Sequence, residues 1–193
     1  LRAAVAFSLN EGAYYNDLGL VLMAKGAHAE ALKLLRAALA LLPAAGGIRV
    51  NIAQCLIDSG DLAAAEREAR AYVAAQPGPD AWTLLARVLR GQERHEEALA
   101  ASAAALQLAP QKRGLRYNHA KALDRAGRAK EALGEYEALA RQQLDTPELA
   151  LALARALYGN GRKNDAEAVA LEGVKRWPGS TSLHGTLARM RLL

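Results

Sequence analysis

Apolar and small residues recur along the whole chain at intervals of three and four residues, and short polar turns interrupt them regularly. In one such stretch Tyr15, Leu18 and Leu22 share a helical face and are followed by a turn at Gly26. This spacing is typical of amphipathic helices that bury one face. The distance between turns predicts helices of about 13 residues, and no segment indicates a strand.

The pattern repeats with a period of 34 residues. Gly26 and Gly60 are 34 residues apart, as are Gly127 and Gly161, and Glu93 takes the place of glycine in the unit between them. Glycine tolerates the positive φ of a tight turn between helices, so each unit is predicted to be a helix–turn–helix hairpin. An alanine follows each turn position by five residues: Ala31, Ala65, Ala98, Ala132 and Ala166. A leucine precedes each turn position by four residues: Leu22, Leu56, Leu89, Leu123 and Leu157. A proline closes four of the five units: Pro43, Pro77, Pro110 and Pro178.

These positions resemble those of the tetratricopeptide repeat family. Tyr72 and Leu139 depart from the pattern, because the other units have a small residue at that position of the second helix. The resemblance implies an all-α, right-handed superhelical solenoid of five full repeats with partial flanking helices. The first unit carries the most matching residues: Tyr15, Leu18, Gly19, Leu22, Gly26, Ala31, Leu35, Ala38 and Pro43.

The repeat register predicts one continuous solenoid domain. Residues 1–9 are interpreted as the tail of a second helix from a preceding repeat, because LRAAVA at 1–6 matches LRAALA at 35–40. A final helix is expected over 180–193, as a cap or as the first helix of a sixth repeat. These ends favour a segment of a longer polypeptide, with a natural C-terminal cap as the alternative. The five repeats are predicted at 10–44, 45–78, 79–111, 112–145 and 146–179.

Composition excludes several kinds of site. Cys55 is the only cysteine, which rules out an internal disulfide and a multi-cysteine metal centre. No uncharged apolar stretch reaches the roughly 18 residues of a transmembrane helix. No catalytic arrangement of side chains is found, so we predict no enzymatic activity, no cofactor and no metal. A single cysteine and the absence of a visible leader favour a cytoplasmic location over a secreted one.

One position of the first helices is basic in four successive units. In tetratricopeptide repeat proteins the first helices line the concave face, so the resemblance implies that this position lies in a groove. Cations there would concentrate positive potential, and arginine binds carboxylates through two hydrogen bonds. Asparagines nearby often bind a peptide backbone in this family, and tyrosines add contact surface. The predicted peptide-binding residues are Asn51, Gln54, Arg87, Tyr117, Asn118, Lys121, Arg155, Tyr158 and Arg189.

These residues predict a non-catalytic scaffold that binds an extended, acidic peptide or partner segment in its concave groove. Two alternatives are a solvated charged face without a ligand, and an accessory domain that recruits substrates or partners for a larger enzyme such as a transferase or oxygenase. Nucleic acid binding is disfavoured, because a net charge of +5 is modest and only 5% of residues are aromatic. No membrane partner is indicated. Self-association through exposed solenoid ends is a further expectation.

Overall fold

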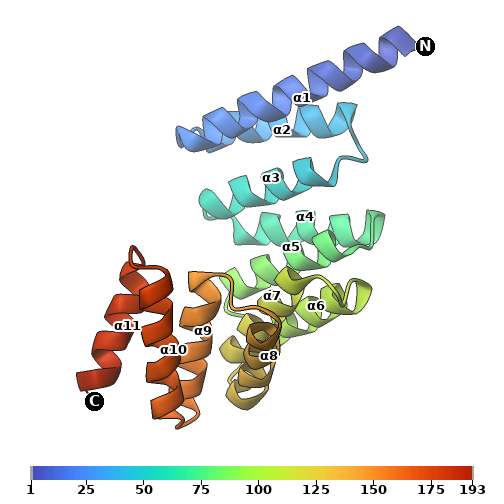
Figure 1. Ribbon diagram of the computed structural model, residues 1–193. Helices are drawn as coiled ribbons and strands as arrows, with labels where there is room; N and C mark the ends of the chain where they lie inside the picture. The colour runs from blue at the N-terminus through green and yellow to red at the C-terminus, as the bar shows by residue number, and fades with distance from the viewer. Residues whose placement is uncertain (1, 193) are drawn as a thin grey trace. The chain divides into compact units, whose positions relative to one another are not determined.

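The computed structural model describes residues 2–192, and side chains from residue 10 onward. Regular structure in this part of the chain is entirely α-helical, which confirms the predicted fold class (Figure 1). The helices are α1 (Arg2–Ala24), α2 (His28–Leu41), α3 (Gly46–Asp58), α4 (Leu62–Ala75), α5 (Pro79–Gly91), α6 (His95–Leu108), α7 (Arg113–Arg125), α8 (Ala129–Gln142), α9 (Pro147–Gly159), α10 (Lys163–Arg176) and α11 (Thr181–Leu192).

The described chain divides into two compact units, and the single continuous solenoid domain expected from the repeat register stays a prediction. The first unit is Leu1–Leu108 with α1–α6, and the second is Ala109–Leu193 with α7–α11. The boundary lies where α6 ends, and Leu108 there is 53% exposed. In a repeat array each hairpin contacts only its neighbours. The contacts between neighbouring helices therefore decide where one compact unit ends and the next begins. A regular sequence period does not reveal such a division.

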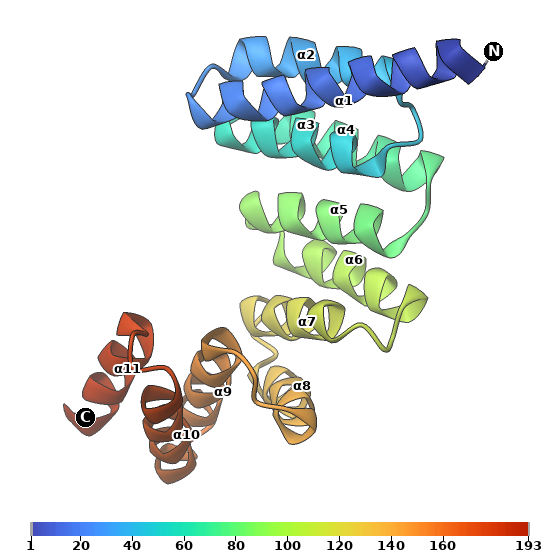
Figure 2. The same cartoon turned by 45° about the horizontal axis from the view of Figure 1, so that its top comes forward.

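Within each unit, successive helices pack in two alternating ways. The first contact joins the two helices of one hairpin, as for α1 with α2, α5 with α6, and α9 with α10 (Figure 2). The second joins a hairpin's second helix to the next first helix, as for α4 with α5 and α10 with α11. Ala31, Ala65, Ala132 and Ala166 are fully buried in the hairpins, so the small residues allow the close approach that their spacing predicted.

The first helix corrects one prediction. Residues 1–9 were expected to form the end of a separate helix, but α1 continues without interruption from Arg2 to Ala24; Leu1 lies outside the described residues. The segment contains no proline, and its first glycine, Gly12, remains helical. A glycine inside a helix costs only about 1 kcal/mol relative to alanine, so nothing in this stretch ends the helix.

The turns inside the hairpins share one backbone conformation. Gly26, Gly60, Gly127 and Gly161 have φ between 76° and 85°, and Glu93 has φ of 60° at the equivalent position. The left-handed region is unfavourable for a residue with a Cβ atom. The Glu93 turn is therefore strained, whereas the glycine turns are not.

We expect Glu93→Gly to raise the unfolding free energy by about 1 kcal/mol, because it removes this strain. The gain is limited because glycine has more conformational freedom in the unfolded chain. Urea unfolding followed by circular dichroism measures the change. The reverse substitution Gly127→Glu is the matched control and should lower stability by a similar amount. A loss of stability in Glu93→Gly would contradict this account of the turn.

Candidate functional site

A cavity of about 260 Å³ lies between α9 and α11 in the second unit. Arg155, Tyr158 and Gly159 of α9 and Thr186, Arg189 and Met190 of α11 line it. Three of the nine predicted residues thus meet at one opening: Arg155, Tyr158 and Arg189.

Local sequence features fix the two helices that form this cavity. Thr146 caps α9, because its Oγ1 accepts a hydrogen bond from the Leu149 N–H at 3.2 Å. Pro147 follows at the first helical position, where its missing N–H is tolerated. Ala154 and Leu187 belong to the apolar cluster beneath, so α11 is held against α9 by burial. The cavity is therefore formed by packed helices rather than by loops.

The cavity combines positive charge with apolar surface. Arg155 and Arg189 are both exposed, and Arg155 Nη2 lies 3.5 Å from Thr186 Oγ1, to which it donates. Lys163 Nζ lies 5.3 Å from the centroid of the Tyr158 ring, which places a third cation beside the tyrosine. Guanidinium groups bind carboxylates in charge-assisted hydrogen bonds, and Tyr158 offers an aromatic surface to the rest of a ligand.

Three further predicted residues lie on α7 of the same unit. Lys121 Nζ lies 5.4 Å from the centroid of the Tyr117 ring, and Asn118, between them in the sequence, is half-buried. The Tyr117 hydroxyl donates to the backbone carbonyl of Glu148 at 3.5 Å. Burial raises the pKa of Tyr117, and the negative charge of Glu148 raises this pKa further. The hydroxyl therefore stays protonated and remains a donor at neutral pH.

The other three predicted residues lie in the first unit. Asn51 Nδ2 donates to Asn16 Oδ1 at 2.8 Å, and Gln54 Nε2 donates to Asp58 Oδ1 at 2.6 Å. Both side-chain amides are thus already engaged within the protein.

Arg87 differs from Asn51 and Gln54 in its hydrogen bonding. Its Nε and Nη2 atoms are buried and have no hydrogen-bond partner in the described part of the chain. Burial lowers the pKa of Arg87, the positive charge of Arg90 lowers this pKa further, and Asp58 opposes both effects. Arg87, Lys121, Arg155 and Arg189 occupy the basic position of four successive units. Because Arg87 lies in the first compact unit and the other three lie in the second, their alignment in one groove stays a prediction.

Thr186 and Met190 were missed by sequence reasoning. Thr186 occupies the repeat position of Asn51 and Asn118, and Met190 occupies that of Cys55. Extending the asparagine position into the last helix would have identified Thr186, whereas the repeat position of Met190 carried no site prediction. Among the residues with described side chains, no three His, Cys, Asp or Glu residues are grouped to hold a metal ion. No described helix has both the length and the apolar character needed to cross a bilayer.

Comparison with known proteins identifies the family. Three models described as tetratricopeptide repeat match residues 22–88, 79–112 and 117–181. The chain matches no curated protein sequence.

Solved structures show the same fold. TTC0263, a TPR protein of Thermus thermophilus, has a TM-score of 0.74 at 23% identity, over 94% of this chain and 100% of that one. A tetratricopeptide repeat protein of Parabacteroides merdae has a TM-score of 0.76 at 14% identity, over 95% and 73%. YrrB, described as a TPR protein with an unusual peptide-binding site, has a TM-score of 0.66 at 17% identity, over 89% of each chain. These family models together match most of the chain, and the matched ranges consist of paired helices. The chain therefore belongs to the tetratricopeptide repeat family.

Proposed function

We propose that this chain is a non-catalytic scaffold that binds an extended, acidic peptide segment of a partner protein, with one carboxylate seated between α9 and α11. The supporting observation is the cavity in which Arg155 and Arg189 meet beside Tyr158 and Met190. The tetratricopeptide fold supports a protein-interaction scaffold in general. The description of YrrB as having a peptide-binding site is consistent with a peptide ligand.

The size of the cavity favours a side chain over a cofactor. About 260 Å³ is below the range of roughly 300–1,000 Å³ typical of small-molecule sites. A glutamate or aspartate side chain places its carboxylate between the two guanidinium groups, while its backbone passes over Tyr158. The remaining peptide then extends along the surface outside the cavity.

Several contacts are needed for useful affinity. A hydrogen bond to a charged group contributes about 1.5–3 kcal/mol, and less where solvent screens it, as it does at the exposed Arg155 and Arg189. Micromolar binding requires about 8 kcal/mol in total. Because α9 and α11 are already packed together, little of the binding energy is lost in ordering the site. Lys163 and Lys121 supply further positive charge in the same unit.

The test compares charge removal at the cavity with charge removal elsewhere. A fluorescent Glu-rich peptide should bind the double variant Arg155→Gln/Arg189→Gln at least tenfold more weakly than the wild type, measured by fluorescence anisotropy. The control Arg36→Gln/Arg141→Gln removes two exposed arginines from α2 and α8 and leaves the net charge equal to that of the first double variant. Its affinity should be nearly that of the wild type.

Equal losses in the two double variants would show that only overall charge matters and would overturn the proposal, as would unchanged affinity in Arg155→Gln/Arg189→Gln. A Gln-rich version of the peptide should bind weakly to every variant. Lys121→Gln tests whether the peptide reaches α7. The accessory role in a larger enzyme and self-association remain predictions.

A further inference from the structure

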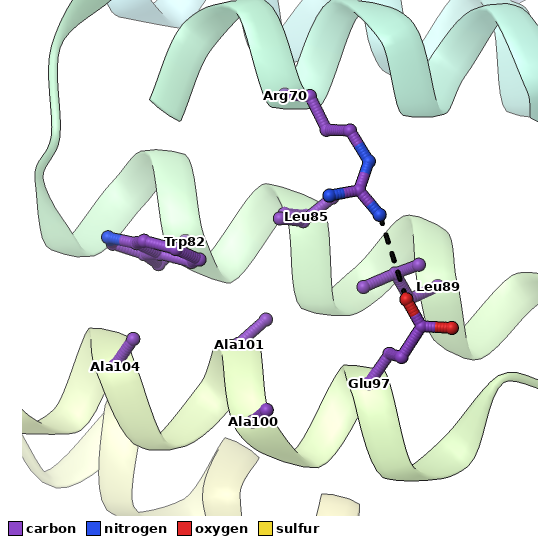
Figure 3. A pocket seen from close by; sticks show the side chains of 8 residues that line it. All are labelled: Arg70, Trp82, Leu85, Leu89, Glu97, Ala100, Ala101 and Ala104. Atoms are coloured by element: carbon purple, nitrogen blue, oxygen red, sulfur yellow. Dashed lines mark ion pairs between the residues drawn. The ribbon is translucent and has the colours of Figure 1, made fainter. Parts of the chain in front are cut away.

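A second cavity, of about 280 Å³, lies in the first unit and is lined by side chains of α4, α5 and α6. Figure 3 shows α5 lying between α4 and α6, with the Trp82 ring seen edge-on at the end of the cavity where Ala104 lies and with Arg70 and Glu97 at the opposite end. The acidic-peptide proposal does not involve this cavity. Its lining residues are Arg70, Trp82, Leu85, Leu89, Glu97, Ala100, Ala101 and Ala104.

Two of the lining positions differ in kind from those of another hairpin. In the repeat register Trp82 corresponds to Arg116, and Ala101 corresponds to Glu135. Arg116 Nη1 and Glu135 Oε2 form an ion pair at 3.0 Å that joins α7 to α8. In the α5–α6 hairpin an indole and a methyl group stand at these positions, so no such pair fills the space between the helices.

The floor and one wall of the cavity are apolar. Leu85 and Leu89 are only 4% and 2% exposed, and the half-buried Trp82 contributes its aromatic surface. Ala100 and Ala104 lie one helical turn apart on α6, and their small side chains leave room for a partner backbone to approach. The volume is that of one or two inserted side chains rather than of a typical small molecule.

The charges at the end of the cavity are balanced. Arg70 Nη2 lies 2.8 Å from Glu66 Oε1 and 3.7 Å from Glu97 Oε2, and Arg70 and Glu97 are each 52% exposed. Glu97 also binds Arg94 at 2.6 Å. A ligand here meets accessible carboxylates and guanidinium groups together. The chemistry therefore differs from that of the α9–α11 cavity, where both ionised lining side chains are arginines.

We propose that this groove, formed by Trp82, Leu85, Leu89 and the α6 alanines, docks an amphipathic helix of a partner protein. The helix inserts a branched aliphatic or aromatic side chain against Trp82, between α4 and α6. The part of the helix that lies over the Arg70–Glu97 end carries both acidic and basic residues, which complement these two exposed side chains. A helix lying in a groove between two helices is a recurring mode of peptide recognition.

Trp82 provides the readout for the test. The chain has two tryptophans, so Trp177→Phe leaves Trp82 as the only one. The probe is a synthetic amphipathic helical peptide with a leucine stripe and mixed Glu and Lys flanks. Its addition should shift the Trp82 emission to shorter wavelength in a saturable manner, because the indole becomes less hydrated. A second peptide with glutamate on both flanks should bind at least tenfold more weakly.

Two variants identify the groove as the binding site. Ala104→Leu fills the cavity with the protein's own side chain and should weaken binding of the mixed-charge peptide at least tenfold. Ala168→Leu adds the same side chain at an exposed position of α10 and should leave the affinity unchanged. The double variant Trp82→Arg/Ala101→Glu recreates the ion pair of the α7–α8 hairpin and should abolish binding in calorimetry. Thermal unfolding by circular dichroism confirms that each variant is folded.

Equal affinity of Ala104→Leu and Ala168→Leu would overturn the docking proposal, as would retained binding in Trp82→Arg/Ala101→Glu. Equal binding of the all-glutamate peptide would overturn the charge assignment. The outcome is independent of the α9–α11 cavity, because Ala104→Leu should not change the affinity for the Glu-rich peptide.

Discussion

Leu35→Ala should lower the unfolding free energy by about 3 kcal/mol, because removing a buried leucine leaves a cavity. Leu35 of α2 is fully buried against α1. The structure explains why a residue this large fits there. A Cβ atom on Gly19 would lie 2.8 Å from Leu35 Cγ, so the glycine is what makes room for the leucine. Gly19→Ala should therefore also destabilise, by about 1–3 kcal/mol, through overpacking.

The double variant Gly19→Ala/Leu35→Ala tests whether packing between these two residues causes the loss of stability in the single variants. It reproduces the pair Ala53 and Ala69, which occupies the same positions in the next hairpin with both side chains fully buried. Its cost should be smaller than the sum of the two single costs by at least about 1 kcal/mol, since each change compensates the other. Urea unfolding of all four proteins measures the coupling. Strict additivity would show that Gly19 and Leu35 do not share this space.

Gly46→Ala should lower the unfolding free energy by about 2 kcal/mol, as expected for an overpacked core. Tyr72 of α4 is 7% exposed and covers Gly46 at the start of α3. A Cβ atom on Gly46 would overlap the Tyr72 hydroxyl oxygen and would lie 2.7 Å from Cζ. The tyrosine ring must then move outward and lose part of its burial.

Gly47→Ala is the matched control for this prediction. Gly47 is the next residue of the same helical turn, and a Cβ atom there would meet nothing within 4 Å. Alanine is favoured over glycine in a helix by up to about 1 kcal/mol, so Gly47→Ala should stabilise the protein. The two neighbouring substitutions thus have opposite expected signs in urea unfolding. Destabilisation by both variants to the same degree would contradict the packing explanation.

Tyr72 shows how far sequence reasoning can reach. The repeat register identified it as a large residue at a small-residue position. The register did not show what accommodates it, because Gly46 lies 26 residues earlier on a neighbouring helix. A similar limit applied to α1, where a match between residues 1–6 and 35–40 suggested a separate helix. Helix continuity depends on local stop signals, and the absence of proline from this stretch outweighed the repeat match.

Of the two candidate sites, one was predicted from the sequence and the other was not. Arg155, Tyr158 and Arg189 were predicted from their positions in the repeat, and the structure places them around one cavity. The groove beside Trp82 was not predicted, although the replacement of Arg and Glu by Trp and Ala was visible in the register. Whether such a replacement leaves a cavity depends on the volumes of all side chains around it.

The sequence by itself determined that this chain forms helical hairpins of the tetratricopeptide type, because helix periodicity, turns and small-residue positions are local properties of the chain. The tertiary structure decided which side chains meet and where space remains between them. Glycine makes room for Leu35 and Tyr72, α9 and α11 place two arginines at one opening, and Trp82 lines a cavity together with alanines of α6. These features depend on contacts between different helices, which a periodic sequence pattern does not specify.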